Sequence, residues 1–182
     1  PAAWSQEDLH LTFTLGPTGL SRSLGFDSFH LTLIVRIGRS LSLDLTVANT
    51  GQQPLNFEEA FHTYFSVTDV HEVSITGLEP TSYIDKIDQF QVKPAAHAPL
   101  TFTGPTDRIY NDTAATCTIH DCAQGRQISI RKTNSQSTVV FNPWKEMPDL
   151  PPWDWHEFLA VETANIGSNS ITLAPGATHT MR

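Results

Sequence analysis

The stretch FHLTLIVRIGRSLSLDLTV, residues 29–47, decides the fold class. Apolar residues recur at every second position, from Phe29 to Ile37 and again from Leu41 to Val47, on either side of Gly38-Arg39-Ser40. A period of two is typical of a half-buried β-strand and does not fit a helix. The short connection containing a glycine favours an antiparallel hairpin. We therefore predict two paired strands here.

The same alternation continues outward along the chain. It begins at Leu9, Leu11, Phe13 and Leu15, and turn clusters at 123–126, 167–170 and 174–177 separate later runs. Those strand-like runs are Phe61–Val67, Val73–Thr76, Leu100–Phe102, Thr116–His120, Gln127–Arg131, Thr138–Phe141, Phe158–Val161 and Ser170–Leu173. Many short strands with almost no helix predict an all-β fold, a large antiparallel sandwich or barrel. Residues 1–182 are long enough for one buried core, so we expect a single domain.

Composition and charge limit the class of partner. Of the 182 residues 16% are charged, and the net charge is −8. Most of the negative charge falls in residues 1–91, so we expect no nucleic-acid or membrane partner. The longest apolar runs are too short to cross a bilayer and the given sequence does not open on a charged-then-apolar stretch, so we expect neither a membrane span nor a leader. The spacing of Cys117 and Cys122 matches neither a redox pair nor a zinc motif, which favours reduced thiols and a cytoplasmic location.

Two side chains are candidates for acid–base chemistry. On a strand, His62 and Tyr64 would share one face, while Phe61, Thr63 and Phe65 would face the other way. Glu162 ends an apolar run, where loss of solvation would raise its pKa and suit it to act as a general base. Each residue also has a plainer interpretation, a structural strand histidine and a glutamate that reaches water. Sequence alone does not place the two side by side.

Other features leave alternatives open. In TDRIY, residues 106–110, Asp107 and Arg108 form either a surface ion pair or a group in which Asp107 accepts hydrogen bonds from ligand hydroxyls. The proline-rich segment 148–155 predicts a loop, around which Trp144, Trp153 and Trp155 either line a ligand site or cover a sheet edge. Phosphate-binding loop, serine-hydrolase, dinucleotide and zinc-protease motifs are absent from the sequence.

Ordered motifs then extend through most of the chain: FHTYF at 61–65, VSITGL at 73–78, TDRIY at 106–110, NPW at 142–144 and VETAN at 161–165. Together they closely resemble the hexose-6-phosphate mutarotases, the glucose-6-phosphate 1-epimerase branch of the aldose 1-epimerase superfamily. The resemblance implies a galactose-mutarotase-like β-sandwich. It also implies interconversion of the α and β anomers of an aldohexose 6-phosphate, glucose 6-phosphate above all, with no cofactor and no metal.

The resemblance also assigns roles to residues of this chain. His62 matches the general acid that protonates the ring oxygen, Glu162 matches the base that deprotonates the anomeric hydroxyl, and Asp107 matches the residue that holds sugar hydroxyls. Tyr64, Arg108 and Trp144 are expected to contact the substrate as well. The alternative is a carbohydrate-binding or regulatory β-sandwich with weak turnover or none.

The family pattern includes an upstream segment that carries the phosphate-binding arginines, before the position of Trp4. We therefore expect an N-terminally shortened sandwich, whose open sheet edge a second copy or another chain would cover. Arg108, Lys86 and Lys145 are the candidates to replace the upstream arginines in binding the phosphate.

Overall fold

The alternating stretch forms a hairpin in the computed structural model, which describes residues 9–147 and 155–182. Strand β2 (Phe29–Ile37) pairs antiparallel with β3 (Leu41–Asn49), and Ile37 lies opposite Leu41 across the turn. This hairpin confirms the prediction from the alternation.

The chain divides into two compact units. Unit 1 comprises residues 9–57 of the described chain together with Ile171–Arg182, and unit 2 comprises Glu58–Ser170. The expectation that residues 1–182 fold as one domain stays a prediction.

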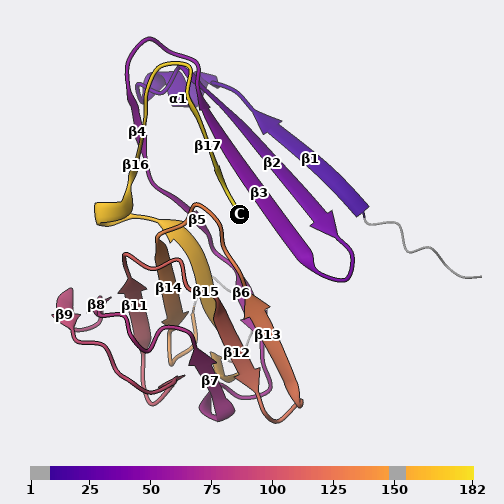
Figure 1. Ribbon diagram of the computed structural model, residues 1–182, viewed down its shortest axis with the longest axis vertical. Helices are drawn as coiled ribbons and strands as arrows, with labels where there is room; N and C mark the ends of the chain where they lie inside the picture. The colour runs from indigo at the N-terminus through magenta and orange to yellow at the C-terminus, as the bar shows by residue number, and fades with distance from the viewer. Residues whose placement is uncertain (1–8, 148–154) are drawn as a thin grey trace, which may run out of the picture. The chain divides into compact units, whose positions relative to one another are not determined.

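Unit 1 is built on a sheet in the order β1-β2-β3-β17, drawn from indigo to yellow in Figure 1. Strand β1 (Leu9–Leu15) lies at one edge and β17 (Thr178–Met181) at the other. Strands β4 (Leu55–Phe57) and β16 (Ile171–Leu173) form a separate pair. The sequence pattern missed the short helix α1 (Gly19–Ser23), which Thr18 caps through a reciprocal hydrogen-bond pair with Ser21.

The two faces of this sheet differ in chemistry because side chains alternate along each strand. Leu11, Val35 and Leu43 lie in one cross-strand row of the apolar face. The opposite face carries Asp44, which is buried and accepts hydrogen bonds from Arg36 and Arg182. A further bond joins Arg182 Nη2 to Asp44 Oδ2 at 2.8 Å. Chiefly through the Arg182 hydrogen bond, these contacts lower the pKa of Asp44 to about 2.

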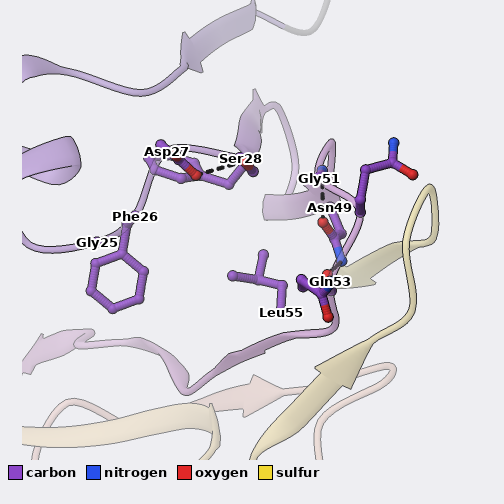
Figure 2. Close-up of a pocket in the computed structure, with 10 residues that line it drawn as sticks. Gly25, Phe26, Asp27, Ser28, Asn49, Gly51, Gln53 and Leu55 are labelled. Atoms are coloured by element: carbon purple, nitrogen blue, oxygen red, sulfur yellow. Dashed lines mark hydrogen bonds between the residues drawn. The ribbon is translucent and has the colours of Figure 1, made fainter.

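A pocket of ≈ 270 Å³ also lies in unit 1 (Figure 2), lined by residues that include Phe26, Asp27, Asn49, Gly51, Gln53 and Leu55. The Asn49 side chain is fully used there: its amide donates to Gln53 O at 2.8 Å and Leu173 O at 3.0 Å, and its oxygen accepts from Gly51 N at 2.9 Å. These bonds hold the loop at residues 49–53 in place, so the polar side chain of Asn49 in the pocket wall is explained by a structural role.

Unit 2 contains two sheets. Within the described residues, the larger sheet follows the order β5-β15-β14-β11-β8-β9, with β6 also paired to β15, and the smaller follows β10-β7-β12-β13. The larger sheet consists of β5 (Glu59–Phe61), β6 (Tyr64–Ser66), β8 (Tyr83–Asp85), β9 (Gln91–Lys93), β11 (Thr106–Tyr110), β14 (Ser137–Asn142) and β15 (Phe158–Asn165). The smaller consists of β7 (Val73–Thr76), β10 (Leu100–Thr101), β12 (Cys117–Asp121) and β13 (Arg126–Ile130). The 3-10 turns are η1 (Val70–Glu72), η2 (Trp155–Glu157) and η3 (Gly167–Asn169).

The hydrophobic core of unit 2 lies between these two sheets. Ile75 and Ile119 contribute from the smaller sheet, and Val140, Leu159 and Val161 contribute from the larger one. Because β-strand side chains alternate, the larger sheet turns its other set of side chains away from this core. The prediction of an all-β, antiparallel fold is confirmed.

Two further observations bear on the sequence predictions. Cys117 is buried on β12 and Cys122 is exposed, each as a free thiol. No helix among the described residues is long and apolar enough to cross a bilayer.

Candidate active site

Strand register places His62 opposite Glu162. Phe61 of β5 pairs with Thr163 of β15, and Tyr64 of β6 pairs with Ala160 of β15. The two short strands therefore follow one continuous register along β15, with His62 between them. The His62 Nδ1 and Glu162 Oε1 atoms lie 3.2 Å apart. The structure therefore brings together the two residues that sequence alone left unplaced.

The two partners differ in exposure. The side chain of His62 is 70% exposed, whereas that of Glu162 is only 10% exposed. Glu162 lies in the middle of β15, a strand whose eight residues are all buried, and not at its end as the sequence suggested. Burial is the main cause that raises the pKa of Glu162, with nearby Asp107 adding to it, while the positive charges of His62 and Lys86 act in the opposite direction. A carboxyl group with a raised pKa is suited to exchange protons near neutral pH.

Asp107 shares the face of Glu162. In the ladder from β11 to β15, Asp107 pairs with Phe141 and Phe141 with Ala160, and Ala160 has the same orientation as Glu162 two residues on. Strand spacing then puts the Asp107 and Glu162 Cα atoms roughly 12 Å apart. The apolar residues between them form a floor, so the site has acid–base groups at one end and a carboxylate at the other.

Lys86 joins this face just after β8. Its backbone N–H donates to Asp107 O at 2.9 Å, which continues the ladder, and its Nζ lies 2.7 Å from Asp107 Oδ2. Lys86 is thus the phosphate candidate that the structure does place at the site. Lys145 lies exposed beyond β14, and no described contact brings it to this face.

Tyr64 also lies on the site face, as the alternation predicted. Its cross-strand partner is Ala160, and its ring packs against Phe158 with centroids 5.5 Å apart. Phe65 pairs with Leu159 on the core side. The predicted division of FHTYF between two faces is confirmed.

Arg108 lies on the opposite face. It sits on β11, a strand that the sequence pattern did not predict, so its side chain points away from that of Asp107. The guanidinium stacks over the Tyr83 ring at 4.6 Å and hydrogen-bonds Tyr110, whose pKa burial raises. The structure therefore corrects the expectation that Arg108 shares a substrate site with Asp107, and the local Asp–Arg pair does not form.

Trp144 has structural contacts. Its ring lies 4.6 Å from Trp155 and 4.7 Å from His71 between centroids, and both tryptophans pack against the core of unit 2. Of the two interpretations left open, these contacts favour a cover for the sandwich, and they do not bring Trp144 to the His62–Glu162 pair. Trp153 lies outside the described residues.

Two asparagines of the motifs hold the strands around the site, a role the sequence did not indicate. Asn142 Nδ2 donates to Trp155 O and Phe158 O, both at 2.8 Å, and anchors the start of β15. Asn165 Nδ2 donates to Glu59 Oε1 at 2.8 Å and ties the end of β15 to β5. A buried amide side chain that hydrogen-bonds to distant parts of the chain indicates this structural role, and such bonds are visible only in the tertiary structure.

Among residues 9–147 and 155–182, no group of three or more His, Cys, Asp or Glu side chains is placed to hold a metal ion. What this face brings together is the imidazole of His62 and the carboxyl group of Glu162, with the Asp107 carboxylate and the Lys86 ammonium group at its other end.

Comparison with known proteins agrees with this fold. A putative mutarotase from Salmonella typhimurium superposes with a TM-score of 0.81 at 23% identity, over 96% of this chain and 59% of that one. A galactose mutarotase-like protein from Lactobacillus casei superposes with a TM-score of 0.73 at 16% identity, over 95% and 68% of the two chains. The fold is therefore that of the galactose-mutarotase-like β-sandwiches.

Sequence comparison identifies the family. The aldose 1-epimerase family model matches residues 6–182, and the chain belongs to that family. A relative from Cenchrus ciliaris named "Putative glucose-6-phosphate 1-epimerase" is 31% identical over 157 residues, which cover 82% of this chain and 47% of the relative. One of the same name from Escherichia coli K12 is 29% identical over 158 residues, covering 85% and 52%. The chain thus spans about half the length of these relatives.

Proposed function

We propose that the protein is an isomerase that interconverts the α and β anomers of an aldohexose 6-phosphate, with glucose 6-phosphate as the first candidate. The observation that carries the proposal is the contact between His62 Nδ1 and Glu162 Oε1 at 3.2 Å. Family membership and the names of the relatives support the reaction class. A small sugar or sugar phosphate is the proposed ligand, and the cytoplasm the proposed location.

The mechanism follows from what ring opening requires. Glu162 removes the proton of the C1 hydroxyl while protonated His62 donates a proton to the ring oxygen. The C1–O5 bond breaks, the C1–O1 bond becomes a carbonyl, and a C5 hydroxyl forms. Rotation about C1–C2 presents the other face of the aldehyde, and reclosure runs the two proton transfers in reverse.

The geometry supports this assignment of roles. Burial raises the pKa of Glu162 toward that of an imidazole, which suits a pair whose members must exchange roles between opening and closing. The His62 side chain is 70% exposed, so its ring has room to turn from Glu162 toward the ring oxygen of a sugar bound on this face. Asp107, at the far end of the apolar floor, would accept hydrogen bonds from sugar hydroxyls and hold the pyranose in register.

The test is magnetisation-exchange NMR of the anomers of glucose 6-phosphate. We expect the wild-type protein to accelerate exchange, and His62→Ala and Glu162→Gln each to lower the rate by about 10²–10⁴-fold. His30→Ala and Glu157→Gln, which change an exposed histidine and an exposed carboxyl elsewhere, are the matched controls. Exchange at the wild-type rate in either site variant would exclude the mechanism.

One observation favours the alternative, a carbohydrate-binding or regulatory β-sandwich. Asp107 already forms an ion pair with Lys86, so neither the carboxylate proposed to hold sugar hydroxyls nor the cation proposed to meet a phosphate is unoccupied on this face. Sugar binding in calorimetry, together with unaccelerated anomer exchange, would establish that alternative. A second copy over the open sheet edge stays a prediction, which sedimentation tests.

A further inference from the structure

Lys86 is held beside Asp107 by one backbone contact and one side-chain contact. The backbone bond from Lys86 N to Asp107 O and the ion pair at 2.7 Å fix both ends of the residue. The turn that follows is closed by Asp85, whose Oδ1 accepts hydrogen bonds from Ile87 N at 3.0 Å and Asp88 N at 3.2 Å. The Lys86 side chain is 36% exposed and that of Asp107 only 17% exposed. The ammonium group therefore covers a carboxylate that already has little contact with water.

The charges on the site face explain why a cation is needed. Glu162 on β15 and Asp107 on β11 are carboxyl groups, and Asp107 disfavours ionisation of Glu162. His62, between β5 and β6, and Lys86, after β8, have the opposite effect: their positive charges favour the ionised form of Glu162. Because His62 is neutral for part of the reaction, Lys86 carries the constant positive charge of the set.

The mechanism proposed above uses His62, Glu162 and Asp107 and leaves Lys86 only as a candidate for the substrate phosphate. Resting on the proposed mutarotase function, we propose that Lys86 is a positioning residue, which fixes the Asp107 carboxylate for a sugar hydroxyl and offsets the charge of the two carboxyl groups on this face. Without Lys86, Asp107 would lose its orienting partner, and Glu162 would face a carboxylate with no adjacent cation.

The rival role for Lys86 is direct binding of the substrate phosphate. The two roles differ in a measurable way. An orienting partner of Asp107 serves a sugar with or without a phosphate, whereas a phosphate ligand serves only the phosphorylated one. A cation near Glu162 also shifts the pH dependence of the reaction, which loss of a purely structural contact would not do.

The experiment compares wild type, Lys86→Met and Lys86→Arg on glucose 6-phosphate and on glucose. For Lys86→Met we expect kcat/KM to fall by about 10- to 100-fold on both sugars, the change that removal of a charged hydrogen bond gives. The acid limb of the pH–rate profile should move to higher pH. Lys86→Arg should restore most of the activity and the original limb. A loss confined to glucose 6-phosphate, or an unmoved acid limb, would overturn the proposal.

Lys93→Met is the matched control. Lys93 belongs to the adjoining β9, pairs with Asp88, and lies opposite Tyr83 on the other side of the sheet from Lys86. It therefore tests the removal of a lysine–aspartate pair in the same hairpin away from the site, and we expect wild-type kinetics.

A second measurement does not depend on turnover. Carbon-13 NMR titration of the Glu162 carboxyl should show a higher midpoint in Lys86→Met than in wild type, and an unchanged midpoint would count against Lys86. If wild-type protein accelerates exchange of neither sugar, the proposed function fails, while this titration still decides the role of Lys86.

Discussion

The Asp44→Asn substitution tests the ionic cluster on the polar face of unit 1. The hydrogen bonds from Arg182 and Arg36 lower the pKa of Asp44 from 3.8 to about 2. The folded state therefore binds this proton less readily than the unfolded state. The stabilisation is fully present above pH 3.8 and is lost as pH falls through about 2.

The magnitude follows from proton linkage. A shift from 3.8 to about 2 corresponds to about 2.4 kcal/mol at pH 5.5, and to about 0.8 kcal/mol at pH 2.5. The advantage of wild type over Asp44→Asn should therefore shrink by about 1.6 kcal/mol between these two conditions. Lost contacts of Arg36 and Arg182 add a destabilisation in the variant that does not depend on the protonation of residue 44.

Urea unfolding followed by tryptophan fluorescence, at both pH values, measures this difference. Glu157→Gln, which changes an exposed carboxyl group, is the control and should show no comparable pH dependence. A stability gap between wild type and Asp44→Asn that is equal at pH 5.5 and pH 2.5, within about 0.5 kcal/mol, would refute the linkage reasoning.

Three further predictions follow from particular residues. Gly77 has φ +100, and an added Cβ would lie 2.1 Å from Thr116 O, so Gly77→Ala should destabilise the protein by more than the roughly 1–3 kcal/mol of backbone strain alone. Gly125 has φ +61 and open space around it, so Gly125→Ala should show in thermal unfolding the strain without the clash. Burial lowers the pKa of Lys132 to about 8, below its unfolded value of 10.5, so the wild type should gain stability relative to Lys132→Met as pH rises from 7 to 9.5; a constant difference in Tm would contradict this. Because burial raises the pKa of Glu162 above 4.5, the acid limb of the pH–rate profile should have its midpoint above pH 4.5, and a midpoint at or below that value would argue against Glu162 as the base.

The site shows where sequence patterns stop being informative. TDRIY forms β11, yet its apolar and polar residues do not alternate, because the charged Arg108 lies on the core side of the strand and the apolar Ile109 lies on the site face with Asp107. The pattern therefore missed the strand and placed Arg108 beside Asp107. The opposite case is β15, whose continuous burial hides any period of two, so Glu162 read as the end of an apolar run although it lies in mid-strand.

The sequence by itself determined the fold class, the hairpin at residues 29–47, the division of FHTYF between two faces, and the family. Those properties depend on local periodicity and on motifs, which neighbouring residues in the chain display directly. Only the tertiary structure decided that His62 meets Glu162, that Lys86 pairs with Asp107, and that Arg108 and Trp144 pack elsewhere. These contacts depend on the register between strands distant in sequence, and a shift of one residue in that register would turn each side chain to the opposite face.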